Sequence, residues 1–528
     1  MRRSRIIAII AAVLLMPACS SGPETGPEAG AELLAAAAEA MGGWEALEAV
    51  QRQEVTTSGN DWDPVQAPAP GEELMINDFE QTTLIDYSNG SMRVDFAGER
   101  SYPAPGPVAF TEVINGDAGA VVMTTPTGET TASRMQASRR VTRLRDLRRS
   151  PRQVLLSARD AGDVTRAEDR TIDGRTYEVL QYTDEGSAVE LLIDPATSLP
   201  SRVSYLETDP LYGDVRNDLA FDDWRDATVL AEGGETLTIQ FPYDQRLLWD
   251  GQRMREETVQ NVVLNGAPDS EAVAIPAEVT AVPDPGEPVV SQWTLRRAVM
   301  GTGTAGYAES GQTAVLTEVA PGVFHATGGS HHSMVVEMAD HLIVVEAPLF
   351  EERSEAVIAA ARERFPDKPI RYAVVTHFHM DHSGGIRTYA AAGATVVGHE
   401  SIVPFLNGVL TRPSTVRPDA LAEASGGSTS VEGVPDTREF TDGTRTLQLL
   451  HVPSGHAEGM LIAYLPQERI AFVSDLYSPP APVPADNANA RAFYQAVVEA
   501  GLDVDQVLGG HGTGPGPFAA LASVMGGS

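Results

Sequence analysis

The chain has 528 residues with 38 basic and 73 acidic side chains, which gives a formal net charge of −35. This length exceeds a single hydrophobic core and therefore predicts more than one domain. The charge would repel phosphate, so a nucleic acid partner is not expected without a local basic groove. Cys19 is the only cysteine, which excludes an intrachain disulfide.

Residues 1–19 have the pattern of an export signal. A basic start, "MRRSR", precedes the eleven-residue apolar run "IIAIIAAVLLM", which is too short to span a bilayer. The following "LMPACSSG" resembles a bacterial lipobox, which implies that Cys19 is lipidated and anchors the mature chain to a bacterial membrane. We expect an exported protein on the periplasmic face, with residues 20–29 as a flexible tether. Ser20 after the cysteine favours the outer membrane, whereas ordinary cleavage nearby would release a soluble periplasmic protein.

Residues 30–285 predict a mainly antiparallel β domain with helices. An alanine-rich helix with a Gly-Gly break comes first, and many short runs with period-2 alternation follow, among them "SMRVDF", "RTYEVLQYT" and "ETLTIQFP". Turn signals such as "DPATSLP" separate the runs and predict a curved antiparallel sheet. The stretch from "YEVL" to "LIDPATSLPSRV" resembles the lipoprotein-carrier half-barrel domains. That resemblance implies an apolar ligand in this domain.

Residues 133–159 interrupt the acidic balance with nine arginines. Pro151 predicts that the segment forms two helical pieces. One interpretation is a solvated helix face. The alternatives are docking on an acidic second domain and contact with anionic lipid head groups.

A proline-rich stretch of small residues, 265–290, separates the two halves of the chain. We place a linker at 286–309 and a second domain at 310–528.

The second domain contains "VVTHFHMDHSGGI" at 374–386. Residues 372–375 predict a buried strand, and the loop that follows bears His377, His379, Asp381 and His382. His377 and His379 are one residue apart, so in extended backbone both point to one side and can bind one metal ion. Asp381 and His382 can reach a second ion, and imidazole with carboxylate suits zinc. The glycines at 384 and 385 are expected to permit a tight turn before a helix.

More candidate ligands follow strand-like runs further along the chain. All eleven histidines lie at or after residue 325, which a random scatter would not produce. His456 follows "TLQLLHV", Asp475 follows "RIAFVS", and His511 follows "QVLGG". Each is a ligand-type residue where a strand ends, which is where α/β proteins place their sites.

This combination resembles the metallo-β-lactamase superfamily over roughly residues 310–528. The resemblance implies an α/β fold, an αββα sandwich with metals between the edges of its two sheets. Its cofactors would be two Zn²⁺ ions, with Fe or Mn as alternatives, and a hydroxide between them would be the nucleophile. Asp475 would bridge both ions, and Asp381 would also orient the nucleophile or pass a proton. The implied ligands are His377, His379 and His456 for the first ion and Asp381, His382 and His511 for the second.

Asp475 favours a hydrolase of ester, lactone or thioester bonds in a small-molecule substrate, because members that hydrolyse antibiotics commonly have cysteine or serine there. The spacings 475 − 456 = 19 and 511 − 475 = 36 leave no room for the extra domain of the nuclease branch. One alternative is a carrier lipoprotein for apolar ligands with an auxiliary metal domain. The other is an iron-dependent redox enzyme, although the flavodiiron branch usually has glutamate where this chain has His379.

Other residues near the motif have less certain roles. His331 and His332 lie in a loop that could contact substrate or simply face solvent. Glu346 ends a strand and could orient a metal-bound histidine. His399 also ends a strand, with a structural role as the main interpretation. The other three histidines, His325, His341 and His451, are expected to be structural.

Overall fold

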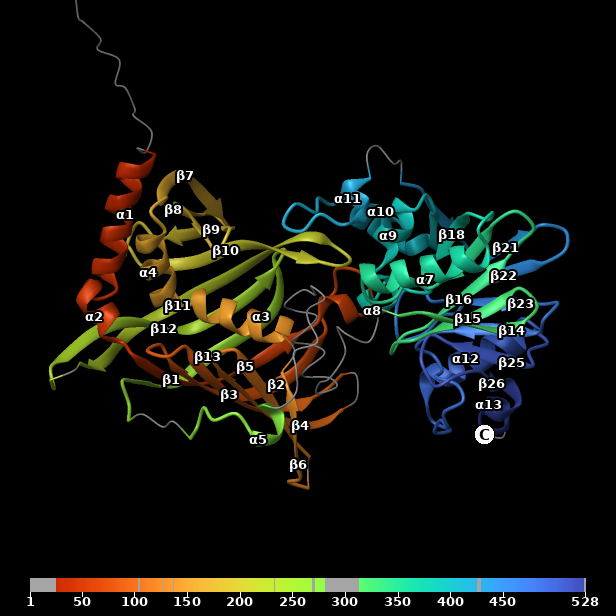
Figure 1. Ribbon diagram of the computed structural model, residues 1–528, viewed down its shortest axis with the longest axis horizontal. Coiled ribbons are helices and arrows are strands. Elements are labelled where there is room, and N and C mark those ends of the chain that lie inside the picture. The colour runs from red at the N-terminus through yellow and green to blue at the C-terminus, as the bar shows by residue number, and fades with distance from the viewer. Residues whose placement is uncertain are drawn as a thin grey trace, which may run out of the picture.

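The computed structural model of the protein describes residues 25–102, 105–125, 127–135, 137–231, 233–267, 271–280, 313–424 and 429–526. Its strands form one sheet of 13 strands in the N-terminal part and sheets of seven and six strands in the C-terminal part. Figure 1 shows the large sheet with its helices on one side of the molecule and the two smaller sheets with theirs on the other. The predicted fold class, an α/β protein with a mainly antiparallel N-terminal part, is confirmed.

The N-terminal sheet is built almost entirely from hairpins between consecutive strands. Only β1 and β13, from its two ends in sequence, pair across a long separation, and β11 touches β13 at one parallel position. The alternating runs that predicted this sheet, "SMRVDF", "RTYEVLQYT" and "ETLTIQFP", lie in or overlap β3, β8 and β12. The strands are β1 (Arg52–Trp62), β2 (Met75–Asp86), β3 (Ser91–Arg100), β4 (Gly106–Asn115), β5 (Ala118–Thr124), β6 (Thr130–Arg134), β7 (Thr165–Ile172), β8 (Arg175–Asp184), β9 (Ser187–Ile193), β10 (Pro200–Asp209), β11 (Gly213–Leu230), β12 (Thr236–Trp249) and β13 (Gln252–Leu264).

In the described residues up to 280, five helices accompany this sheet: α1 (Pro27–Ala40), α2 (Gly43–Ala49), α3 (Ala137–Arg148), α4 (Pro151–Ala161) and α5 (Ala277–Thr280). The Gly-Gly break separates α1 from α2, because Gly42 and Gly43 both have positive φ. Leucines of α1, α2 and α4 share one buried cluster with the middle strands. Helix α3 ends before Pro151, and α4 begins at it, so the predicted pair of helical pieces is confirmed.

The arginines of residues 133–159 face their own sheet, so the interpretation as a solvated helix face is wrong. Arg139 and Arg143 are buried and both pair with Glu112 of β4. Arg149 pairs with Asp184 of β8, and Arg152 donates to two backbone carbonyls near α2. The basic segment is therefore neutralised by carboxylates and carbonyls of the N-terminal part itself.

The C-terminal part has two sheets packed face to face. Their inner faces share a buried cluster of valines, leucines and isoleucines, and helices cover the outer faces, as Figure 1 shows. This is the αββα arrangement that the family resemblance implied. The seven-stranded sheet holds β14 (Val315–Ala320), β15 (Val323–Thr327), β16 (Ser333–Glu337), β17 (Leu342–Val345), β18 (Ile370–Val374), β19 (Thr395–His399) and β20 (Val431–Val434); the six-stranded sheet holds β21 (Thr437–Thr441), β22 (Thr446–His451), β23 (Leu461–Leu465), β24 (Ile470–Val473), β25 (Gln506–Gly509) and β26 (Gly516–Pro517).

The helices of this part are mostly short. They are α7 (Glu351–Arg364), α8 (Met380–Ser383), α9 (Ile386–Ala391), α10 (Val403–Thr411), α11 (Ala420–Glu423), α12 (Ala488–Glu499) and α13 (Phe518–Met525), with a 3-10 turn at Glu400–Ile402. Parallel pairing of β17, β18 and β19 places the carboxyl ends of these strands at one edge. Parallel pairing of β24 with β25 does the same in the second sheet.

The two parts of the molecule are in contact. Tyr212 packs edge-on against Phe405 of α10, with ring centroids 5.9 Å apart. Arg412 donates to the carbonyl of Tyr212 at 2.6 Å and pairs with Asp250 at 2.5 Å. Figure 1 shows α8 on the side of the C-terminal part that faces the large sheet.

Several expectations concern residues outside the described ranges. The signal at 1–19 with Cys19, the first half of the tether at 20–29 and the linker at 286–309 all lie there. The predicted tether extends too far, because its last three residues, 27–29, belong to α1. Among the described residues, no helix has the length and apolar character to cross a bilayer.

Candidate metal centre

The segment 376–383 leaves β18 and turns immediately into α8. Ser383 fixes this turn, because its hydroxyl donates to the carbonyls of Phe378 and His379, each at 2.9 Å. His377, His379 and His382 are completely buried. A buried ring nitrogen that binds neither a hydrogen-bond partner nor a metal ion is unfavourable. The nitrogens of these three imidazoles therefore need partners.

Gly384 and Gly385 form the turn between α8 and α9, as the sequence analysis predicted. Neither has a positive φ; the values are −58° and −98°. Both are also needed for close packing: a Cβ on Gly384 would lie 1.9 Å from the carbonyl oxygen of Leu349, and one on Gly385 would lie 1.9 Å from Ser354 Oγ. The glycines let the ligand-bearing turn lie directly against the end of β17.

A first group of ligand-type side chains consists of His377, His379, His456 and Asp475, whose ligand atoms lie within 4.8 Å of one another. His456 Nε2 is 3.4 Å from His377 Nε2 and 3.1 Å from Asp475 Oδ2. These residues come from the ends of β18, β22 and β24. The structure thus brings together the residues proposed for one metal.

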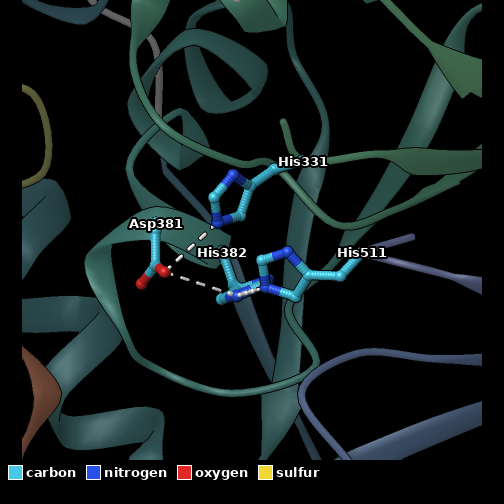
Figure 2. A group of neighbouring side chains, drawn as sticks. All are labelled: His331, Asp381, His382 and His511. Carbon is cyan, nitrogen blue, oxygen red and sulfur yellow. Dashed lines mark hydrogen bonds and ion pairs between the residues drawn. The ribbon is translucent and has the colours of Figure 1, made fainter. Parts of the chain in front are cut away.

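A second group consists of His331, Asp381, His382 and His511. Figure 2 shows the three imidazoles converging beside the Asp381 carboxylate. His382 Nε2 is 3.2 Å from His511 Nε2, and His331 Nε2 is 3.2 Å from Asp381 Oδ2. His331 therefore lies among the candidate metal ligands. The sequence analysis had placed it in a loop that contacts substrate or faces solvent.

Asp475, a member of the first group, also contacts the second group, because its two oxygens face different sides. Oδ2 faces His456, as above, whereas Oδ1 lies 2.8 Å from His382 Nε2 and 3.0 Å from His511 Nε2. One carboxylate thus joins two clusters of ring nitrogens. This is the geometry expected of a carboxylate that bridges two metal ions.

The distances between the facing ring nitrogens of these side chains fit zinc. Ligands at ~2.0–2.1 Å from a tetrahedral ion lie ~3.3 Å apart, which matches the two spacings between facing Nε2 atoms. His379 Nδ1 is buried and has no hydrogen-bond partner, while its Nε2 donates to the carbonyl of Ala67 at 3.0 Å. That bond fixes the tautomer and leaves the Nδ1 lone pair directed into the first group.

The pKa shifts of the side chains in the centre also favour the binding of a metal cation there. Burial lowers the pKa of His379 to about 3 and that of His331 to about 4, so both imidazoles are neutral at pH 7, which is the form that binds metal. Burial opposes charge on His382 too, but Asp475, Glu346 and Asp381 together raise its pKa well above the usual value. Burial alone would raise the pKa of Asp475, yet the imidazoles of His382 and His511 hold it well below its usual value.

Glu346 lies behind His382. It accepts hydrogen bonds from Thr376 Oγ1 at 2.6 Å and from His382 Nδ1 at 3.0 Å. Its φ of 72° is unusual for a residue with a side chain, and the two bonds hold it there. The structure places Glu346 where it can orient an imidazole of the second group.

The remaining candidate histidines lie outside both groups. His332 Nε2 donates to the carbonyl of Gly512 at 2.9 Å, and its ring packs edge-on against His325. His399 stacks on His451 at 4.0 Å between centroids and bonds Ser401. His341 pairs with Asp340. These contacts give each of them a structural role.

Three residues of the N-terminal part reach the centre and were missed by the sequence analysis. Gln66 Nε2 donates to Asp381 Oδ1 at 2.5 Å, and Tyr102 donates to Gln66 Oε1 at 2.7 Å. Ala67 supplies the carbonyl that holds His379. The only available signal was the proline-rich interruption "DPVQAPAP" between two strands, which marks a loop without indicating what it contacts.

Comparison with known proteins gives one family and several relatives. Residues 326–513 match the family described as the metallo-beta-lactamase superfamily. A linear primary-alkylsulfatase from Pseudomonas sp. (strain ATCC 19151) is 29% identical over 178 residues, which are 28% of this chain and 33% of the alkylsulfatase. The chain thus matches about a third of the length of that curated relative.

Two solved structures illustrate the range of similar folds. A metallo-beta-lactamase from Pontibacter korlensis is 19% identical with a TM-score of 0.32, covering 40% of this chain and 98% of its own. The stereoselective inverting sec-alkylsulfatase Pisa1 from Pseudomonas sp. is 18% identical with a TM-score of 0.31, covering 40% of each chain.

Proposed function

Residues 326–513 form a domain of the metallo-beta-lactamase superfamily, and on that basis we propose that the chain is a dinuclear zinc hydrolase of ester-like bonds. The observation that carries the proposal is the position of Asp475 between two groups of imidazoles. A single metal would need only one of these groups. Two groups that share a carboxylate suit a pair of ions ~3.5–4 Å apart.

The ligand assignment follows from which atoms face each group. His377, His379 and His456 would hold one ion, Asp381, His382 and His511 the other, and Asp475 both. The bound ions would supply Lewis acidity and lower the pKa of a coordinated water toward ~7. His331, the remaining member of the second group, would be either a further ligand or a contact of the reacting bond.

The protein's own groups define how a proton can move at the site. Asp381 Oδ2 faces His331 Nε2 at 3.2 Å, so a proton can pass between this carboxylate and this imidazole. Burial keeps His331 neutral at pH 7, in the form that can accept a proton at one ring nitrogen. Burial of the surrounding side chains limits bulk water at these atoms.

The bond class is an ester in the broad sense: a carboxylic ester, lactone, thioester or sulfate ester. The bridging aspartate motivates the first three, and the alkylsulfatase relative motivates the fourth. The substrate would be a small molecule, and the net charge of −35 makes nucleic acid an unsuitable one.

We also propose that Cys19 is lipidated and tethers the enzyme to the periplasmic face of a bacterial membrane, the outer membrane by its Ser20. The support is the basic and apolar start of the chain and the small residues around its only cysteine. Fractionation of the export host tests this directly.

Two other functions have less support. A carrier of apolar ligands would need an apolar cavity. The space beneath α3 and α4, about 160 Å³, has a mixed lining, with apolar side chains such as Leu219 and Phe221 beside charged and amide ones such as Arg143 and Gln245. An iron-dependent redox enzyme would use the same residues with another metal. Metal analysis of the purified protein distinguishes iron from zinc.

The decisive assay compares zinc-loaded and chelator-stripped protein, residues 20–528, on a panel of substrates. The panel holds an aryl ester, a lactone, a thioester, an alkyl sulfate, a phosphodiester and a β-lactam. Zinc-dependent turnover of one of the first four supports the proposal and names the bond. Turnover that is unchanged by removal of metal would refute it.

A further inference from the structure

Three consecutive residues of the loop between β1 and β2 contact two of the loops that form the candidate metal centre. Gln66 Nε2 donates to Asp381 Oδ1, the Ala67 carbonyl accepts from His379 Nε2, and the Pro68 carbonyl accepts from the Glu458 N–H at 2.7 Å. Glu458 is two residues beyond His456. A segment more than 300 positions earlier in the chain therefore contacts both metal groups.

This loop is held rigidly enough to position a side chain. Residues 63–67 are buried, and Gln66 has only 1% of its surface exposed. Its 3-10 turn (Pro64–Gln66) has Pro64 at its start, and Val65 joins a core cluster with residues of the C-terminal part. Rigid supporting contacts of this kind are what hold a site in its working geometry.

The two carboxylate oxygens of Asp381 have different partners, and Gln66 binds one of them. Its amide donates to Oδ1, so that oxygen is occupied on the side of the N-terminal part, and Oδ2 faces His331 and His382. Tyr102 sets the orientation of the amide, because its hydroxyl donates to Gln66 Oε1 and leaves Nε2 for the carboxylate. A neutral donor suits this position, since a second carboxylate would repel Asp381.

We propose that Gln66 is a positioning residue of the metal centre, supplied by the N-terminal part, that holds Asp381 with Oδ2 toward the second metal ion. The inference rests on the proposed function, because it assumes that Asp381 binds metal. It makes the N-terminal part a component of the site: without the loop at 66–68, Asp381 and His379 each lose the partner that orients them.

The test uses the full mature chain with Gln66→Met, which keeps the length of the side chain and removes the donor, and Gln66→Glu, which keeps the shape and replaces the donor by an acceptor. Gln181→Met, at an exposed glutamine of β8 that bonds Glu190, is the matched control. Zinc affinity is measured for each of the two equivalents by competition with a chelator. Melting temperature and turnover are measured on the same samples.

We expect both Gln66 variants to bind one zinc equivalent ~10–100-fold more weakly, as substitutions behind metal ligands do, while the other equivalent is unchanged. Gln181→Met should match the wild type. Two unchanged equivalents in both variants, or equal weakening of both with a lower melting temperature, would overturn the inference. Because zinc affinity needs no substrate, the site-selective loss can appear even if no bond in the panel is hydrolysed, which would reject only the proposed function.

Discussion

Glu112 should control how the N-terminal part responds to acid. The carboxylate is 2% exposed and lies between Arg139 and Arg143. Burial alone would raise its pKa, but the two guanidinium groups lower it from 4.5 to about 2. At 1.36 kcal/mol per pKa unit, this difference is worth about 3 kcal/mol of folding free energy. Because the folded-state pKa is the lower one, that stability is present above pH 4.5 and is lost as the pH falls toward 2.

The substitution Glu112→Gln isolates this contribution. At pH 6 it leaves two buried arginines without their carboxylate, which costs roughly 3–5 kcal/mol. The free energy of unfolding of the wild type and the variant is measured by urea titration from pH 6 to pH 2. We expect the difference between them to shrink by about 3 kcal/mol over that range. A difference that stays constant with pH would refute the reasoning, because it would mean that Glu112 titrates alike in the folded and unfolded states.

Three further predictions concern the centre and the tether. Glu346→Gln removes the carboxylate behind His382 and should weaken zinc binding ~10–100-fold, as measured by competition with a chelator. The control is Glu439→Gln, at an exposed glutamate. Equal zinc affinity in the two variants would contradict the role of Glu346. His331→Ala should lower turnover roughly 100-fold, because Nε2 faces Asp381, whereas His332→Ala should have a smaller effect; equal rates in the two variants would place His331 outside the chemistry. Cys19→Ala should move the protein from the membrane fraction to the soluble fraction of the export host, and unchanged membrane retention would reject lipidation.

The metal centre could be predicted because its signal is local. His377, His379, Asp381 and His382 lie within six positions, and a strand that precedes a ligand-type residue marks a sheet edge from sequence alone. The short hairpins of the large sheet were predictable for the same reason, since alternation and turn residues are read within a few positions.

The features that the sequence analysis missed depend on contacts between segments that are far apart in the chain. Gln66 lies 315 positions before Asp381, and an amide in a proline-rich loop has no chemical signature. The arginines of α3 looked like a solvated face because their partners Glu112 and Asp184 lie on β4 and β8, far from α3 in the sequence. The turn at Gly384 and Gly385 was predicted, but the close approach of Leu349 and Ser354, which precede them by 35 and 31 positions, was not. Periodicity and composition carry no information about such partners.

The central claim is that Asp475 joins two metal ions, and zinc content with turnover of Asp475→Ala tests it most directly. The control is Asp367→Ala, an exposed aspartate in the turn before β18. We predict two zinc ions per chain in the wild type and the control. In Asp475→Ala we predict loss of most of the metal and a fall in turnover of at least ~100-fold, since the ions supply several kcal/mol. Two tightly bound zinc ions and normal turnover in Asp475→Ala would contradict the account.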